Sequence, residues 1–156
     1  MEKENKTRKE LIVSAIENGT VIDHIPTQSV FQVIRILNLD QIGQQILFGT
    51  NLDSSKYGKK GIIKVNNKYF KPVEINKIAL VAPTATLIVI KDYQVVEKMR
   101  VEIPDTIQEF VKCVNPNCIT NVENVQTKFK VIDKEESKLK CHYCEKITEK
   151  KNMAFK

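Results

Sequence analysis

The hydrophobic positions of the first hundred residues follow two spacings, one typical of strands and one typical of helices. Short runs rich in β-branched residues, bounded by turn residues, predict strands, and they occupy residues 20–25, 44–51, 59–65, 84–90 and 94–101. Two segments between them carry apolar side chains at helical spacing. The first follows Pro26, with apolar positions at Val30, Phe31, Val33, Ile34 and Leu37, and the second begins at Lys71-Pro72 and ends before Pro83.

These elements follow one another in the order strand, helix, strand, strand, helix, strand. That order is the split βαβ arrangement of a ferredoxin-like α/β sandwich, in which two helices pack on one face of an antiparallel sheet. Residues 94–101 would add an edge strand or a hairpin partner. We expect Thr27 to cap the first helix and Pro72 to lie in the first turn of the second. The sequence therefore predicts the α+β class.

All four cysteines lie in the last third of the chain, in two short pairs. Cys113 and Cys118 form the first pair, and Cys141 and Cys144 form the second. Zinc prefers a tetrahedron of soft ligands, and one turn can supply two thiolates, so we predict one structural Zn²⁺ on these four side chains. Two disulfides would require an oxidising compartment. A redox dithiol normally opens a helix after a strand, whereas a charged run precedes Cys141.

The segment that carries the cysteines is too small to fold on a hydrophobic core alone. A chain of about fifty residues buries too little apolar surface to offset its conformational entropy, and zinc binding can supply the missing free energy. We predict a small all-β, zinc-ribbon-like domain over residues 105–156, joined near Pro104 to a first domain over residues 1–104. Four cysteines leave the metal no open position for a substrate, so we do not expect this chain to be an enzyme.

Composition and charge argue against several classes of function. No apolar stretch is long enough to span a membrane, and the N-terminal residues lack the features of a secretory signal, so we expect a cytoplasmic protein. We find neither a glycine-rich phosphate loop nor a nucleophile motif. The net charge is +6, of which residues 105–156 contribute +2. Four thiolates with one Zn²⁺ would bring that domain close to neutral.

Two other functions are compatible with four cysteines. A zinc-ribbon nucleic-acid-binding adaptor is favoured by the sequence pI of about 9.1, but such modules usually have a clearly basic face. A rubredoxin-like electron carrier normally has two tight cysteine pairs beside glycines, and the first pair here is longer and lacks glycine. Neither alternative accounts for the first domain.

Two polar residues, Asp23 and His24, interrupt the strand predicted at residues 20–25. One interpretation is turn or edge chemistry, with His24 hydrogen-bonded to a backbone carbonyl. The other is that His24 binds an anionic ligand together with Lys64 and Lys98 from two other predicted strands. The residues alone leave both interpretations open.

Several segments carry a family resemblance that covers nearly the whole sequence. They include Thr20-Val-Ile-Asp-His-Ile-Pro26, Ala79-Leu-Val-Ala-Pro83, Cys113-Val-Asn-Pro-Asn-Cys118 and Cys141-His-Tyr-Cys144. In motif content and order the chain resembles the aspartate carbamoyltransferase regulatory chain. The resemblance implies a noncatalytic subunit of the enzyme that condenses carbamoyl phosphate with aspartate in pyrimidine biosynthesis. From the charge of the second domain and the lack of an apolar span, we expect no nucleic-acid or membrane partner.

The resemblance also implies a role for each domain. The first domain would bind nucleotide effectors, CTP with UTP as inhibitors and ATP as activator, and would pair with a second regulatory chain in a homodimer. The zinc domain would dock on the catalytic chain. Allosteric control would pass from the first domain to the catalytic chain through the second.

The resemblance implies a nucleotide pocket, and ten of its positions can be assigned to residues of this sequence. The backbone of residues 13–16 would contact the ribose and base, and Asp23 would lie by the ribose and phosphates. His24 and Lys98 would meet the triphosphate in charge-assisted contacts, and Lys64 would reach the ribose and base. The backbone around Ile90 and Tyr93 would read the base edge. The full set is Val13, Ser14, Ala15, Ile16, Asp23, His24, Lys64, Lys98, Ile90 and Tyr93.

Overall fold

A computed structural model of the protein describes residues 15–156. The chain forms two compact units that divide after Glu102, and each is described by itself. Among the described helices, none has the length and apolar character that a membrane crossing needs.

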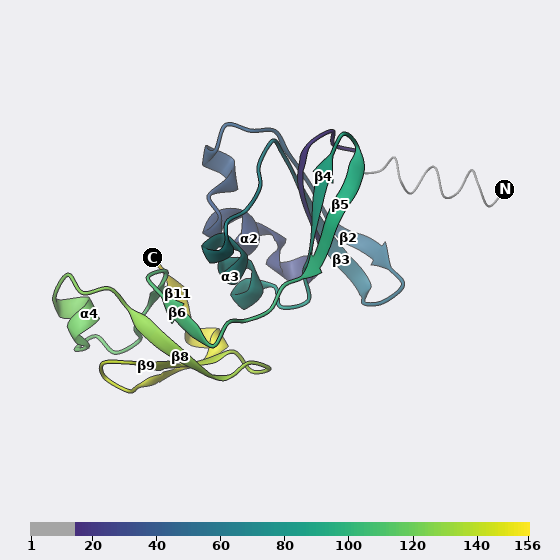
Figure 1. Ribbon diagram of the computed structural model, residues 1–156. Helices are drawn as coiled ribbons and strands as arrows, with labels where there is room; N and C mark the ends of the chain where they lie inside the picture. The colour runs from purple at the N-terminus through teal and green to yellow at the C-terminus, as the bar shows by residue number, and fades with distance from the viewer. Residues whose placement is uncertain (1–14) are drawn as a thin grey trace. The chain divides into compact units, whose positions relative to one another are not determined.

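The first unit is built on a five-stranded antiparallel sheet (Figure 1). Its strands are β1 (Gly19–Ile25), β2 (Ile46–Ser54), β3 (Gly58–Asn66), β4 (Thr86–Lys91) and β5 (Gln94–Arg100). They lie in the order β2-β3-β1-β4-β5. Without β5 this is the ferredoxin-like order, so the predicted fold is confirmed, and β5 is the added edge strand.

Two helices, α2 (Val30–Ile36) and α3 (Pro72–Val81), contact each other beside the sheet (Figure 1). The core of the unit combines their buried side chains with those of the central strands, because β1 and β3 each bury residues against the helices. Its largest fully buried members include Ile22, Ile25, Val30, Val33, Ile63 and Ile78. Pro72 occupies the first turn of α3, as predicted.

The start of the first helix differs from the prediction. A short 3₁₀ helix, Thr27–Ser29, precedes α2, and Thr27 does not cap it. Instead the Thr27 hydroxyl donates to Asn51 Oδ1 (3.0 Å) and accepts from the Asn51 backbone N–H (2.7 Å). Phe31 is 56% exposed rather than part of the buried face, and its ring packs edge-on against Phe48 at 5.5 Å.

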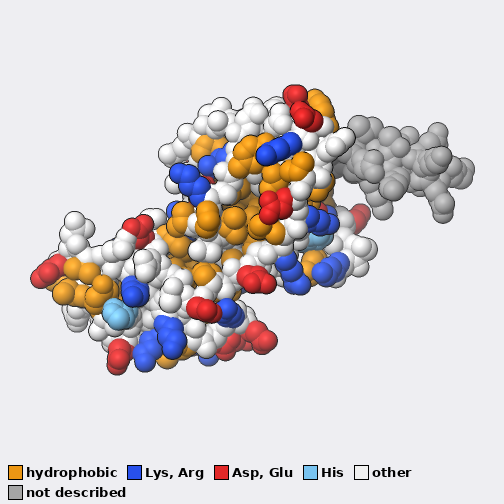
Figure 2. Space-filling view, viewed as in Figure 1, with side chains coloured by type: hydrophobic (Ala, Val, Ile, Leu, Met, Phe, Trp, Pro, Cys, Tyr) orange, Lys and Arg blue, Asp and Glu red, His pale blue; other side chains and the backbone are white. Residues whose placement is uncertain are grey.

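The added edge strand leaves apolar side chains in solvent. Every residue of β5 is exposed, and the exposed apolar side chains of β5 and the preceding turn are Tyr93, Val95, Val96 and Met99. Figure 2 shows hydrophobic side chains gathered on the face of this unit that carries β4 and β5. An exposed apolar surface of this kind is typical of protein contacts.

The second unit has a four-stranded antiparallel sheet in the order β10-β9-β8-β6 and a two-stranded pairing of β11 with β7. The strands are β6 (Thr106–Gln108), β7 (Val111–Lys112), β8 (Lys128–Asp133), β9 (Lys138–Cys141), β10 (Ile147–Thr148) and β11 (Ala154–Phe155). Ile107, Phe129 and Leu139 form its buried centre. The predicted small β domain is confirmed, with one short helix, α4 (Ile119–Val122), that the sequence did not predict.

Candidate functional site

The four cysteine sulfurs of the second unit converge on one point. All four Sγ atoms lie within 4.8 Å of one another, with Cys113 and Cys144 3.6 Å apart and Cys118 and Cys141 3.7 Å apart. A metal ion with sulfur ligands at about 2.3 Å in a tetrahedron requires sulfurs about 3.8 Å apart. Two sulfur pairs already have this separation, so the four side chains are placed to hold a tetrahedral metal centre.

Short turns position these sulfurs, and α4 supports the turn of residues 113–118. The Cys118 N–H donates to the Asn115 carbonyl (3.0 Å). From α4, the Asn121 side chain donates to the carbonyls of Cys113 (2.9 Å) and Asn115 (2.7 Å). The Thr120 hydroxyl donates to Cys118 Sγ (3.2 Å). The helix that the sequence missed thus orders the residues around two of the ligands, as outer contacts of metal sites commonly do.

Burial affects the thiols unequally. Desolvation raises the pKa of Cys113 to about 12 and also raises the pKa of Cys141. At Cys144 desolvation is outweighed by hydrogen bonding, chiefly from the Lys146 backbone, so the pKa falls to about 7. Buried thiols with raised pKa values need a cation to become thiolates, so metal binding and deprotonation of this cluster are coupled.

On the first unit, strand register brings residues of four strands into one row across the sheet. Lys64 of β3 lies opposite Val21 of β1, Val21 lies opposite Ile88 of β4, and Ile88 lies opposite Lys98 of β5. Residues directly opposite in neighbouring strands project to the same face. Lys64 and Lys98 therefore share one face of the sheet, with Val21 and Ile88 between them.

Asp23 and His24 lie at one end of the same face. Asp23 lies opposite Thr86, two residues along β1 from Val21. His24 has φ 56° at an irregularity in β1, and its Nδ1 is 3.2 Å from the Thr86 hydroxyl. A non-glycine residue in the left-handed region is costly and is often found at binding sites. Here the left-handed backbone conformation of His24 places its imidazole close enough to the Asp23 carboxylate to interact with it electrostatically.

Three further residues surround His24 that the sequence analysis did not select. Lys60 Nζ lies 2.8 Å from Asp23 Oδ1, and both side chains are largely buried. The Tyr57 ring meets the His24 ring edge-on at 5.8 Å, and Lys56 lies over Tyr57 at 5.3 Å. These residues come from the β2–β3 turn and the start of β3, whose proximity to β1 only the sheet register reveals.

Burial and charged neighbours of both signs act on the His24 imidazole. Its pKa is lowered, first by desolvation, and then by Lys60, Lys56 and Lys98, while Asp23 acts in the opposite direction. Desolvation also lowers the pKa of Lys64, against the opposing effect of Asp23. A partly buried histidine and lysine whose charged forms are desolvated gain from a bound anion, because the anion stabilises those charged forms.

The remaining predicted pocket residues lie at the opposite end of β1. Ile90 lies opposite Gly19, and the Tyr93 N–H donates to the Glu17 carbonyl (2.9 Å), next to buried Ile16. Ala15 is exposed and has no regular structure. Val13 and Ser14 lie outside the described residues. The described candidates thus run from Ile16 and Tyr93 at one end, past Lys64 and Lys98, to Asp23 and His24.

Comparison with known protein families assigns both units to the same kind of chain. Residues 11–102 match the family model described as the allosteric domain of the aspartate carbamoyltransferase regulatory chain. Residues 105–154 match the model for the metal-binding domain of that chain. The chain belongs to the aspartate carbamoyltransferase regulatory chain family. It is accordingly a noncatalytic subunit with an allosteric and a metal-binding part.

Individual relatives with the same name match this chain over nearly their whole length. The aspartate carbamoyltransferase regulatory chain of Thermococcus sibiricus is 55% identical over 148 residues, 95% of this chain and 97% of its own. That of Pyrococcus furiosus is 53% identical over 146 residues, 92% and 96%. That of Bacteroides fragilis is 49% identical over 151 residues, 97% and 99%.

Proposed function

We propose that the protein binds the nucleotides CTP, UTP and ATP on the cationic face of its first unit and controls the catalytic chain of aspartate carbamoyltransferase through its second. CTP and UTP inhibit and ATP activates. The observation that carries the proposal is the strand register that brings Asp23, Lys64 and Lys98 to one face of the sheet, with the His24 ring beside Thr86, the residue opposite Asp23. The functional boundary lies between residues 104 and 105.

The chemistry of this face suits a nucleoside triphosphate. His24, Lys60 and Lys98 would meet the phosphates in charge-assisted hydrogen bonds. Lys64 would reach the ribose, and the backbone at Ile16, Ile90 and Tyr93 would read the base. Tyr93 has φ 63° and is 66% exposed, so its turn lies at the surface of the unit. Asp23, already paired with Lys60, would orient that ammonium and accept from the ribose.

The metal that we propose for the cysteine cluster is Zn²⁺. Four thiolates in a tetrahedron are the ligand set of structural zinc sites, which leave no position for substrate. Bound zinc would tie β9 and the turn of residues 113–118 together, and so shape the unit that docks on the catalytic chain. The alternative of a nucleic-acid adaptor is not favoured by the family match.

The proposed partners are the catalytic chain and a second copy of this chain, in the cytoplasm. The exposed apolar side chains at Val95 and Val96 support a protein contact on the first unit. In typical allosteric systems, binding of an effector at one site changes the free energy of binding at the other by about 1–3 kcal/mol.

Isothermal titration calorimetry on the zinc-loaded full chain tests the proposal directly. We expect saturable binding of CTP and ATP by the isolated chain, with UTP measured in the presence of CTP. Binding should weaken with rising salt, because phosphate contacts are electrostatic. A protein that carries one zinc ion per chain but takes up none of the three nucleotides would exclude this function.

Nucleotide affinity should also fall as the pH rises through the titration of His24. In the free protein desolvation and the cations Lys60, Lys56 and Lys98 hold the pKa of His24 below 6.5. A triphosphate beside it would raise that pKa, so binding takes up a proton between the two values. Calorimetry from about pH 6 to about pH 8, where histidine titrates, should show this proton uptake in buffers of different ionisation enthalpy.

The matched control for this pH dependence is His24→Gln. It keeps a hydrogen-bonding side chain but removes the titration, and it leaves only the titration of the nucleotide's own phosphate. An identical pH dependence in the two proteins would show that His24 does not face the phosphates.

A further inference from the structure

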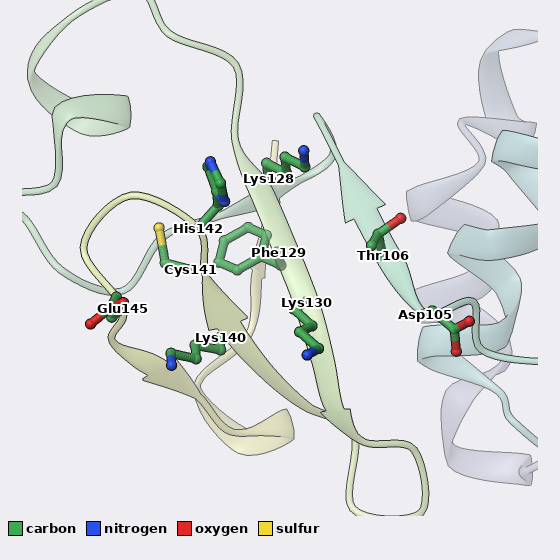
Figure 3. A pocket seen from close by; sticks show the side chains of 9 residues that line it. All are labelled: Asp105, Thr106, Lys128, Phe129, Lys130, Lys140, Cys141, His142 and Glu145. Atoms are coloured by element: carbon green, nitrogen blue, oxygen red, sulfur yellow. The ribbon is translucent and has the colours of Figure 1, made fainter.

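A second cationic site lies in the C-terminal unit, in a pocket lined by residues of β6, β8 and β9 and the turn after β9 (Figure 3). Its cavity of about 350 Å³ falls within the range of small-molecule sites. Figure 3 shows Lys128 and Lys130 on β8, Thr106 on β6, Lys140 on β9 and His142 just after it. Figure 2 shows basic side chains and a histidine gathered on the viewed face of this unit.

The register of the sheet sets two of these lysines directly against each other. Thr106 lies opposite Lys130, Lys130 lies opposite Lys140, and Lys140 lies opposite Ile147. Lys128 stands two residues from Lys130 on the same side of β8. Like charges directly opposite in a sheet destabilise it. The sheet therefore places two like charges on opposite residues, where an anion shared between them would be stabilising.

The nearby carboxylates do not cancel this charge. Asp105 Oδ1 is 2.8 Å from Lys134 Nζ, and the hydrogen bond from Lys134 lowers the Asp105 pKa. Within the part of the chain that the structure describes, Lys128, Lys130 and Lys140 form no salt bridge. Glu145 is the one other carboxylate that lines the cavity. Three ammonium groups, the Thr106 hydroxyl and the His142 ring thus offer hydrogen-bond donors around one cavity.

We propose that this pocket binds a phosphate group, either as inorganic phosphate or as a small phosphate monoester. A phosphate dianion offers several acceptor oxygens around two negative charges, and lysine is a common phosphate ligand. Bound between Lys130 and Lys140, it would turn their repulsion into attraction to a shared anion. The site is distinct from the nucleotide face because all its residues belong to the other unit, and it does not depend on the nucleotide proposal.

The test is a phosphate titration of the zinc-loaded, ¹⁵N-labelled full chain at constant ionic strength, with chloride as the balancing ion. Inorganic phosphate and methyl phosphate are titrated separately, so that the tighter ligand distinguishes the free anion from an ester. We expect saturable amide shifts at Thr106, Lys130 and Lys140. Lys130→Ala should raise the phosphate Kd at least about fivefold, since a charge-assisted contact is lost.

Two controls make the result decisive. Lys151→Ala removes a cation of the same unit that pairs with Glu149 and should leave the Kd unchanged, and unchanged zinc content shows that each variant is folded. Shifts that grow linearly without saturation, or an unchanged Kd in the Lys130→Ala/Lys140→Ala double variant, would overturn the proposal. So would lysine variants that weaken binding to the catalytic chain but not to phosphate, because they would assign the pocket to protein carboxylates.

Discussion

Replacing Cys113 by serine should unfold the C-terminal unit while the N-terminal unit keeps its structure. Cys113 is buried at the centre of the thiol cluster, 3.6 Å from Cys144. Zinc binding in small domains supplies about 10–16 kcal/mol of apparent free energy, which is folding free energy. The buried centre of this unit rests mainly on a few large side chains, among them Ile107, Phe129 and Leu139. It has little other stability to draw on.

The expected signs of this unfolding are specific to one part of the chain. Zinc per chain should drop from one toward zero, and limited proteolysis should cut residues 103–156 and spare the first unit. His142→Ser is the matched control, since its exposed side chain lies between two ligands but is not needed as one. A Cys113→Ser protein that kept its zinc and its resistance to protease would refute a four-cysteine site.

Replacing Lys98 by alanine should lower the affinity for CTP and ATP about tenfold or more and leave zinc content unchanged. Lys98 is exposed on β5, in the row that contains Lys64. A hydrogen bond between charged groups contributes about 1.5–3 kcal/mol, and 1.4 kcal/mol corresponds to a factor of ten in Kd. Calorimetry on the full chain measures the change.

Lys59→Ala provides the matched control for Lys98→Ala. Lys59 is an exposed cation of the same sheet, but it pairs with Asp53 (2.6 Å) on the β2–β3 hairpin. Its loss changes the net charge equally, so any general electrostatic effect appears in both variants. Equal loss of affinity in the two variants would mean that Lys98 has no specific contact with the nucleotide.

The sequence predicted the elements of the first unit because local patterns and packing agreed there. The β-branched runs became β1 to β4, and Pro72 began α3, as their chemistry requires. The spacing of the cysteines predicted their convergence, because zinc geometry restricts which thiols can meet. Lys64 and Lys98 were one of two interpretations that the residues left open, and the family resemblance favoured it. The register of β3, β1, β4 and β5 explains how they share a face.

The features that the sequence missed depend on contacts between distant segments. Thr27 was expected to cap a helix, but hydrogen bonds to Asn51 across 24 residues hold it instead. Phe31 fits the apolar face by spacing, yet it lies exposed against Phe48. Lys60 became a neighbour of Asp23 only through the pairing of β3 with β1, with its irregular register near Ile25. No local pattern encodes such pairings.

The central claim is that one unit senses nucleotides and the other conveys the signal to a catalytic chain. The most direct measurement is the carbamoyltransferase activity of a purified catalytic chain reconstituted with this protein, with and without CTP, while the mass of the complex is followed by light scattering. We predict a stable complex that CTP inhibits, and a Lys98→Ala complex of the same mass that responds much less to CTP. Activity that is indifferent to CTP in a fully formed, zinc-loaded complex would contradict the account.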